Sequence, residues 1–508
     1  MEKYQNPVIR GFHPDPSICR NGNDYYLVTS TFEYFPGVPL YHSRNLANWE
    51  LEGHCLTTSS QLPLEGCGHS GGIYAPTIRY HNGTYYMTTT NVSSIRNFIV
   101  HTQDPAHGWS DPVPVDQTGI DPSLFFDEDG KVYYTSTAQD NEKKDCIQMC
   151  EINPLTGEKI SESRIISHGC GGCYPEGPHI YRKGGFYYLL LAEGGTEYGH
   201  HAVMMRAKNI WGPYEGSPHN PLVYHQPLLG HTSIQAVGHS DLIEDQNGNW
   251  WMVCLGIRPV SYGLLHNLGR ETFLVPIKWG ADGWPEAGDH GTLSLNMEGP
   301  LPAPACPVSQ VFYDNFDTGS LNPRWTFLRN PAPGSFRLDL KPGCLSLTGC
   351  HSLSEPGCSP AFCGVRQEEY HMEACACLEG GLKEGQQAGL TAFYTCNYHY
   401  EIYLKHEDGC YFIGVNKRIH DLEKEVFCDK TDYEGRLWLE ISCDETSYHF
   451  RFGNGSHMKE AASGLVAGLC TEGTARMTFT GTFIGLFSNG GTAHFSGFSM
   501  KNLSGPSQ

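Results

Sequence analysis

Five aromatic doublets, each placed just after a turn signal, constrain the fold of this chain more than any other feature. They recur 48 to 63 residues apart, and each follows a short run rich in Asn, Asp or Gly. Aromatic and β-branched residues after such a turn are typical of strands. A repeat of this length is what a four-stranded propeller blade requires. The pattern therefore predicts an all-β, five-bladed β-propeller, marked by Tyr25-Tyr26, Tyr85-Tyr86, Tyr133-Tyr134, Tyr187-Tyr188 and Trp250-Trp251.

A short segment that changes from polar to apolar lies upstream of each doublet. It begins with Asp15 in the first repeat, Ala75 in the second and Asp121 in the third. The fourth and fifth repeats have Glu176 and His239 at this point, so all five residues precede their doublets by 10 to 12 positions. Equivalent positions in propeller blades lie in a ring around the axis. We therefore expect three carboxylates and one imidazole to meet at a common centre.

A proline-rich segment, residues 302–307, divides the chain. Its composition is typical of a linker, and we assign residues 1–304 to the propeller and 305–508 to a second domain. In the second part, apolar and polar residues alternate between Gly-containing turns, for example in 398–404 and 437–441. Many short strands of this kind predict a β-sandwich of about 200 residues.

The charge balance argues against several classes of partner. The chain carries 34 basic and 55 acidic residues, a net charge of −21, and no basic run is interleaved with aromatics. Nucleic acid and anionic membrane surfaces are therefore poor partners. No apolar stretch approaches the roughly 20 residues of a membrane span. The first residues lack the apolar core of a signal peptide, and we expect a cytoplasmic protein.

The 20 cysteines allow two interpretations. Most of them, like Cys254, stand in apolar strand-like runs, which is typical of reduced and buried thiols. The alternative is a zinc site, because two cysteine pairs roughly imitate the spacing of zinc ligands. The first pair is one residue too wide for a standard zinc knuckle. These pairs are Cys146 with Cys150 and Cys170 with Cys173.

Three carboxylates around one centre suit the hydrolysis of a glycosidic bond. One must be protonated to act as an acid, another must be ionised to activate water, and a third can raise the pKa of the acid. Each segment alone would be interpreted as a turn cap, but three at equivalent positions favour a catalytic centre. A non-catalytic sugar-binding propeller is the alternative, although binding alone does not require both Asp15 and Glu176. Residues 68–72 match the nucleophile elbow of a serine esterase, but Pro76 argues against the helix that this motif needs.

A series of short motifs also runs through the chain in a fixed order. They are Asn6-Pro7-Val8-Ile9, Gly11-Phe12-His13-Pro14-Asp15-Pro16-Ser17, 29–37, 70–76, 121–125, Glu176-Gly177-Pro178-His179, 192–196, Gly238-His239-Ser240 and Leu268-Gly269-Arg270-Glu271-Thr272. In this order they closely resemble family 43 of the glycoside hydrolases, in its β-xylosidase and α-L-arabinofuranosidase branch. The part that begins at Asp314-Asn315-Phe316 resembles the sandwich domain of these enzymes.

The resemblance implies an exo-acting, inverting enzyme that releases xylose, arabinose or both from hemicellulose oligosaccharides. It implies that Asp15 is the general base, Glu176 the general acid, and Asp121 the residue that tunes the acid and orients the sugar. Relatives often have an acidic residue at the position of Thr77 and a Trp at the position of Tyr74, so the sugar preference stays open. No cofactor is expected to be required, and we expect a homo-oligomer.

The resemblance also implies residues that bind the sugar. Arg270 would contact hydroxyls as a donor fork, and Phe32 and Tyr74 would be platforms for the apolar face of the ring. His239 would lie near the axis, where related enzymes often hold a calcium ion through water. The segment 479–483 resembles a loop that helps to close the site in related xylosidases. Phe483 is our first candidate for this wall, and Phe479 is the second. The alternative is that these residues belong to the packed core of an ordinary strand.

Overall fold

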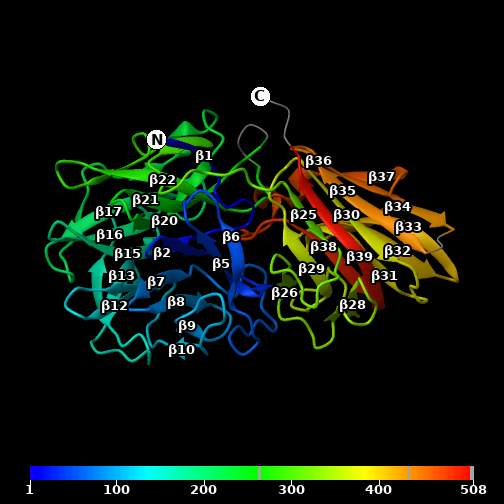
Figure 1. The fold of residues 1–508 in the computed structure, drawn as a ribbon, viewed down its shortest axis with the longest axis horizontal. Coiled ribbons are helices and arrows are strands. Elements are labelled where there is room, and N and C mark those ends of the chain that lie inside the picture. The colour runs from blue at the N-terminus through cyan, green and yellow to red at the C-terminus, as the bar shows by residue number, and fades with distance from the viewer. Residues whose placement is uncertain (261–264, 433–434, 504–508) are drawn as a thin grey trace.

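The structure is a computed structural model that describes residues 1–260, 265–432 and 435–503. The described residues form strands and three short 3-10 helices, with no α-helix, so the prediction of an all-β chain is confirmed. Figure 1 shows two halves, one coloured blue to green and one yellow to red. Within the described residues, no helix is long and apolar enough to cross a membrane. The 3-10 helices are η1 (Gln226–Leu228), η2 (Val466–Leu469) and η3 (Thr471–Gly473).

The first half contains five antiparallel sheets, each formed by strands that follow one another in the sequence. Every predicted doublet lies on the second strand of its own sheet, because the turn before it joins the first strand to the second. The first two sheets are β2 (Ser17–Asn21), β3 (Asp24–Val28), β5 (Gly37–Ser43), β6 (Glu50–Leu56), then β7 (Thr77–His81), β8 (Thr84–Asn91), β9 (Arg96–Thr102), β10 (Val113–Pro114).

The third sheet is formed by β11 (Ser123–Phe126), β12 (Val132–Gln139), β13 (Asp145–Glu151) and β14 (Arg164–Ser167). The fourth has β15 (Glu176–Lys183), β16 (Phe186–Glu193), β17 (His201–Ala207) and β18 (Glu215–Gly216), with β19 (Val223–Tyr224) also paired to β17. The fifth has β20 (Gln235–Glu244), β21 (Trp250–Ile257), β22 (Glu271–Trp279) and β23 (Pro285–Ala287). Outside these sheets, β1 (Glu2–Gln5) pairs with β24 (Asn296–Gly299), so the start of the chain lies beside the end of the fifth sheet.

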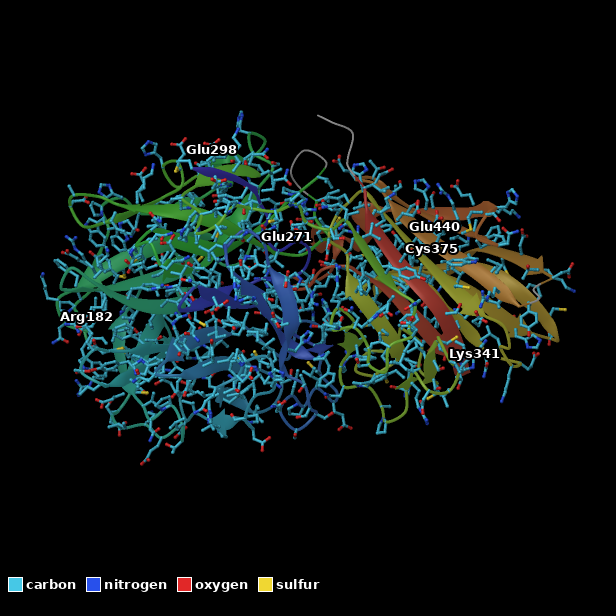
Figure 2. The ribbon with its side chains drawn as sticks, viewed as in Figure 1. Arg182, Glu271, Glu298, Lys341, Cys375 and Glu440 are labelled. Carbon is cyan, nitrogen blue, oxygen red and sulfur yellow. The ribbon has the colours of Figure 1, made fainter. Side chains whose placement is uncertain are left out.

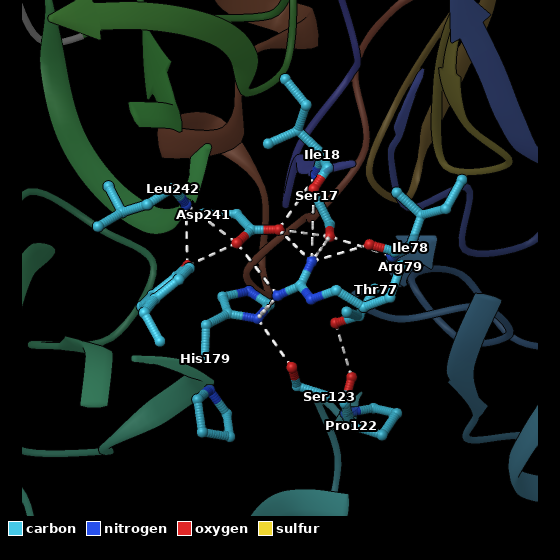
Figure 3. A network of polar contacts seen from close by, with 12 residues as sticks. Ser17, Ile18, Thr77, Ile78, Arg79, Pro122, Ser123, His179, Asp241 and Leu242 are labelled. Carbon is cyan, nitrogen blue, oxygen red and sulfur yellow. Dashed lines mark hydrogen bonds and ion pairs between the residues drawn. The ribbon is translucent and has the colours of Figure 1, made fainter. Parts of the chain in front are cut away.

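The first strands of the five sheets meet in the middle of this half. In sequence order each of β2, β7, β11, β15 and β20 contacts the next, and β20 contacts β2. Each strand contributes at least one polar side chain to a buried network, shown in Figure 3. Within it, Arg79 donates to the Asp241 carboxylate at 2.7 Å and is 2.9 Å from Nδ1 of His179. Ser17 donates to Asp241 at 2.6 Å, and Ser123 lies 2.9 Å from the same nitrogen of His179.

The second half consists of two antiparallel sheets. One sheet contains β25 (Val311–Asp314), β27 (Phe336–Arg337), β28 (Leu345–Gly349), β30 (Met372–Glu379), β35 (Arg436–Cys443), β36 (Ser447–Gly453), β37 (Met458–Leu465) and β39 (Gly491–Asn502). The other contains β29 (Ala361–Arg366), β31 (Gln387–Thr395), β32 (Tyr398–Glu407), β33 (Cys410–Ile419), β34 (Leu422–Thr431) and β38 (Phe483–Asn489). Side chains of both sheets, such as Leu390 and Leu439, belong to one buried hydrophobic cluster.

The two halves are joined by a paired strand, an apolar cluster and ion pairs. β4 (Tyr34–Phe35) pairs with β26 (Phe327–Leu328) across the junction. Glu271, labelled between the halves in Figure 2, binds Arg258 at 2.7 Å, and Arg258 also binds Glu369 at 2.7 Å. These contacts fix the second half beside the centre of the first. A buried cluster of aromatic residues spans both halves and includes Phe12, Phe32, Tyr34, Phe362, Phe483 and Phe487.

Candidate active site

The three predicted carboxylates lie at the same end of three first strands. Asp15 and Asp121 immediately precede the Pro-Ser segments that lead into β2 and β11, and Glu176 is the first residue of β15. Asp15 and Asp121 both have a left-handed backbone, with φ of 53° and 54°. Such a conformation costs a non-glycine residue on the order of 1–3 kcal/mol and is found mainly where the surroundings hold it for function.

These carboxylates line one small cavity with a volume of about 100 Å³. Seven of the eight predicted site residues reach it, and the structure thus brings together residues from all parts of the first half. The cavity is lined by Asp15, Phe32, Tyr74, Ala75, Ile120, Asp121, Glu176, Thr196, His239, Arg270 and Phe479.

Asp15 is surrounded by groups that favour its ionised form. Nη1 of Arg270 lies 3.1 Å from its Oδ1, and Ser30 donates a hydrogen bond to its Oδ2. Nδ1 of His239 lies 3.8 Å from Oδ1. Burial alone would raise the pKa of Asp15, but Arg270, His239 and Ser30 outweigh burial and hold this pKa below its ordinary value. Asp15 is therefore ionised at neutral pH.

Glu176 is in the opposite situation. Burial raises its pKa well above the ordinary value, and the negative charges of Asp121 and Asp15 raise it further. Burial also raises the pKa of Asp121 to about 6, although His239 and a hydrogen bond from the backbone N–H of Gly177 (3.2 Å) oppose the shift. One cavity therefore contains a carboxyl whose pKa is lowered and a carboxyl whose pKa is raised, as general base and general acid catalysis requires.

The residue after Glu176 must be a glycine. Gly177 has a φ of +57°, and a Cβ atom there would lie 3.1 Å from Nε2 of His239. A larger residue would displace the His239 ring or the backbone that presents Glu176.

Arg270 connects the base to the wall of the cavity. Its guanidinium donates to Oγ1 of Thr196 at 2.7 Å and to the carbonyl of Phe479 at 3.2 Å. It lies over the rings of Phe32 and Phe479, at 5.7 and 5.6 Å from their centroids. Its Nε is buried and has no hydrogen-bond partner in the part of the chain that the structure describes.

The prediction that Phe483 lines the site needs a correction. Phe483 is fully buried as the first residue of β38, and its ring stacks on Tyr34 with a centroid distance of 4.1 Å. Phe479, the second candidate, lines the cavity instead, and its N–H donates to Oγ of Ser70 at 3.0 Å. Ser70 therefore supports the cavity wall, and no helix follows it, so it is not a nucleophile elbow.

The sequence interpretation missed three polar residues of the site. Thr196 and Ser30 hold the Arg270–Asp15 pair, and the buried His200 places Nε2 at 3.9 Å from Oε1 of Glu176. Thr196 and Ser30 lie within motifs noted for their resemblance, but neither motif indicates which of its side chains faces the cavity.

A second, larger hollow begins at Glu176. It has a volume of about 470 Å³ and shares Ile120 and Glu176 with the first cavity. Its other lining residues are mostly polar, and Gln139 donates to the Asp145 carboxylate at 2.9 Å. They are Thr118, Gly119, Thr137, Ala138, Gln139, Asp145, Tyr174 and Pro175.

Neither position predicted to hold a metal has a fitting set of direct ligands among the described residues. Calcium prefers six to eight oxygen ligands. In the described residues, His239, Asp15 and Asp121 do not form a group of three whose ligand atoms lie within 4.8 Å of one another, so this donor set does not fit a directly bound calcium. In the zinc alternative, Cys146 and Cys150 are buried on β13 whereas Cys170 and Cys173 are exposed. In the described part of the chain, these four cysteines form no group that could hold a metal ion.

Both halves of the chain match models of known protein families. The model of glycosyl hydrolases family 43 matches residues 4–285. The model of the beta xylosidase C-terminal concanavalin A-like domain matches residues 313–501.

Similar proteins cover nearly all of the chain. The non-reducing end alpha-L-arabinofuranosidase BoGH43B of Bacteroides ovatus is 41% identical, over 96% of this chain and 92% of its own length. A xylan 1,3-beta-xylosidase of a Vibrio species is 35% identical, over 95% of each chain. The solved structure of Bacteroides ovatus xyloglucan PUL GH43B has a TM-score of 0.93 at 38% identity, and covers 99% of this chain and 100% of that one.

Proposed function

This chain belongs to family 43 of the glycosyl hydrolases, and from that premise we propose that it removes single xylose or arabinose units from the ends of hemicellulose oligosaccharides with inversion. The observation that carries the proposal is that Asp15 and Glu176 line one cavity, in which their surroundings lower the pKa of the first and raise the pKa of the second. A protein that only binds sugar, the alternative considered from the sequence, needs no such pair of acid and base.

We assign the catalytic roles accordingly. Asp15, ionised, takes a proton from a water molecule as that water attacks the anomeric carbon. Glu176, protonated, gives its proton to the glycosidic oxygen as the bond from this oxygen to the carbon breaks. Asp121 keeps Glu176 protonated through its negative charge and holds the backbone of Gly177. We expect about 6.5–9.5 Å between the Asp15 and Glu176 carboxyls, which leaves room for the water.

The small cavity is the proposed site of the sugar unit that is released. Its volume of about 100 Å³ suits one sugar ring rather than a chain. The rings of Phe32, Tyr74 and Phe479 supply apolar faces for the ring carbons. The planar fork of Arg270, which also lines the cavity, supplies donors for hydroxyls.

The larger hollow is the proposed site of the leaving group. It opens at Glu176, the residue that must donate to the leaving oxygen, and it has room for several sugar units. The exposed ring of Tyr174 and the polar groups of Gln139 and Asp145 provide a platform and hydrogen bonds for a polar oligosaccharide. A small cavity that suits one sugar ring, next to a larger hollow on the other side of Glu176, supports exo-action.

We further propose that the five sheets are the blades of a five-bladed β-propeller comprising residues 1–304, followed by a β-sandwich of residues 305–508. The closed cycle of contacts between the first strands supports the propeller. The buried cluster shared by the two sheets of the second half supports the sandwich.

The remaining proposals concern cofactors, assembly and location. We propose that catalysis requires no cofactor, so treatment with EDTA should leave turnover unchanged. A calcium ion held through water near His239 would be revealed if Ca²⁺ added after this treatment raised the thermal stability of Cys358→Ser as it does that of wild type. A homo-oligomer is proposed, and light scattering tests it. All 20 thiols are unpaired, which supports a reducing, cytoplasmic location.

Hydrolysis of an aryl β-D-xyloside and an aryl α-L-arabinofuranoside tests the proposed function. Wild-type protein should cleave at least one of them, and the relatives' names include both activities. Asp15→Asn is the matched control, because it keeps the shape of the base while removing its charge, and it should cleave neither. Binding of xylose or arabinose by the wild type without hydrolysis of either glycoside would favour the sugar-binding alternative.

A further inference from the structure

A group of three potential metal ligands lies in the second half, in the loop that joins β28 to β29. His351, Glu355 and Cys358 place their ligand atoms within 4.8 Å of one another. In the described part of the chain, no other group of three or more His, Cys, Asp or Glu residues meets this condition. The loop is separate from the cavity that contains Asp15 and Glu176, and none of its residues lines either hollow of the active site.

The three side chains converge on one carboxylate oxygen. Oε2 of Glu355 lies 2.8 Å from Nδ1 of His351 and 3.7 Å from Sγ of Cys358. Its other oxygen, Oε1, accepts a hydrogen bond from the backbone N–H of Ser352 at 2.9 Å. With metal–ligand bonds of about 2.0–2.3 Å, neighbouring ligands of a tetrahedral site stand roughly 3.3–3.8 Å apart. The observed spacing needs only a small expansion to admit a cation.

The backbone hydrogen bond orients the carboxylate in the way that outer contacts orient the ligands of known metal sites. The turn after Glu355 contains Gly357, with a φ of +75°, which lets the chain bring Cys358 back toward His351. The side chains of His351 and Glu355 are 45% and 44% exposed, so a cation could reach them from solvent.

The donor chemistry selects the class of cation. A set of one imidazole nitrogen, one thiolate sulfur and one carboxylate oxygen suits zinc and similar divalent transition metals, whereas calcium and magnesium prefer oxygen alone. We propose that His351, Glu355 and Cys358 form a binding site for a divalent cation of the zinc class, with water in the fourth position. On binding, the Cys358 thiol gives its proton to solvent and the thiolate bonds to the metal.

This site would act on the structure and not on the chemistry of hydrolysis. The carbonyl of Cys358 accepts a hydrogen bond from the buried Arg329, whose Nε also donates to the carbonyl of Cys67 in the first half. The backbone N–H of Arg329 donates to the carbonyl of Glu33 at 2.8 Å. A cation that fixes Cys358 would therefore hold the loop against the junction between the halves and raise thermal stability.

Cobalt(II) is the best probe, because it replaces zinc and its bond to a thiolate gives a charge-transfer absorption. The full-length protein, reduced with a phosphine and stripped with EDTA, is titrated with Co²⁺. We expect one equivalent to produce the absorption and one equivalent of Zn²⁺ to remove it. Cys358→Ser should abolish the absorption. His351→Ala should weaken Co²⁺ binding by more than the roughly 10- to 100-fold typical of losing an outer contact.

Cys306→Ser is the matched control, because it removes an exposed thiol from a different segment and should leave the absorption unchanged. Zn²⁺ should raise the melting temperature of wild type and of this control, but not of Cys358→Ser. Glycosidase activity of Cys358→Ser, expected to equal that of wild type, shows that the variant is folded. The proposal is overturned if wild type gives no thiolate absorption, or if Cys358→Ser retains it.

Discussion

Replacement of Arg270 by methionine should move the whole pH–activity profile to higher pH. The guanidinium favours the ionised form of Asp15, and it also lowers the pKa values of Asp121 and Glu176. Without it, the pKa of each carboxyl rises. The acid limb of kcat/KM reports the group that must be ionised and the alkaline limb the group that must be protonated. Both limbs therefore shift in the same direction.

The size of the shift follows from the distance between Arg270 and Asp15. Two unit charges 3.1 Å apart interact by about 5 kcal/mol at an effective dielectric constant of about 20. At 1.36 kcal/mol per pKa unit this is an upper limit of about 4 units. His239 and Ser30 remain beside Asp15 in the variant, so we expect the acid limb to rise by about 1–3 pH units.

The assay is kcat/KM on an activated aryl glycoside across the pH range in which the variant stays folded, as judged by circular dichroism. Arg270→Lys is the matched control, because it keeps the charge and loses the fork. The acid and alkaline limbs of its pH profile should stay closer to those of wild type. Its KM should rise, because the lysine loses contacts to the sugar hydroxyls. An Arg270→Met profile that keeps the wild-type limbs, or moves to lower pH, would refute the electrostatic role.

Four further predictions concern Asp121, the two phenylalanines near the site and the cysteines. Asp121→Asn should move the alkaline limb of kcat/KM to lower pH, by about one unit or more, because Glu176 ionises more easily without a neighbouring negative charge; a limb at higher pH contradicts this. Phe479→Ala should raise KM about 2- to 13-fold, the equivalent of about 0.5–1.5 kcal/mol of lost ring contact, with little change in the urea midpoint. Phe483→Ala should instead lower the free energy of unfolding by about 3–5 kcal/mol. A larger loss of stability in Phe479→Ala than in Phe483→Ala would contradict the placement of the two rings. Thiol counting in denaturant should give 20 thiols per chain with or without reductant, and several disulfides in fresh protein would contradict the reduced state.

Much of the first half could be predicted because its signals are local and repeated. An aromatic doublet beside a run of Gly, Asn or Asp predicts a strand after each turn, and each doublet lies in a sheet of its own. The meeting of Asp15, Asp121 and Glu176 followed from their equivalent positions in the repeats. A repeat converts long separation in sequence into a symmetric arrangement in space, so neither side-chain packing nor long-range pairing had to be known.

The misses concern side chains whose direction is set by tertiary packing. Phe479 and Phe483 occupy similar local sequences, and only the start of β38 at Phe483 decides that one ring enters the core and the other reaches the cavity. The ion pair of Arg79 and Asp241 joins the first strands of two sheets (Figure 3), and it could not be inferred because the repeat does not indicate which polar side chains of these strands face one another.

The assignment of Asp15 as base and Glu176 as acid is tested most directly by the configuration of the first sugar released. Proton NMR of a β-xyloside digestion, or of an α-L-arabinofuranoside digestion if that is the better substrate, distinguishes the two anomers before they equilibrate. A single displacement by water activated by Asp15 predicts α-xylose from a β-xyloside, or the β-anomer from an α-arabinofuranoside. First release of the anomer that the substrate carried would mean a covalent intermediate and a different role for Asp15.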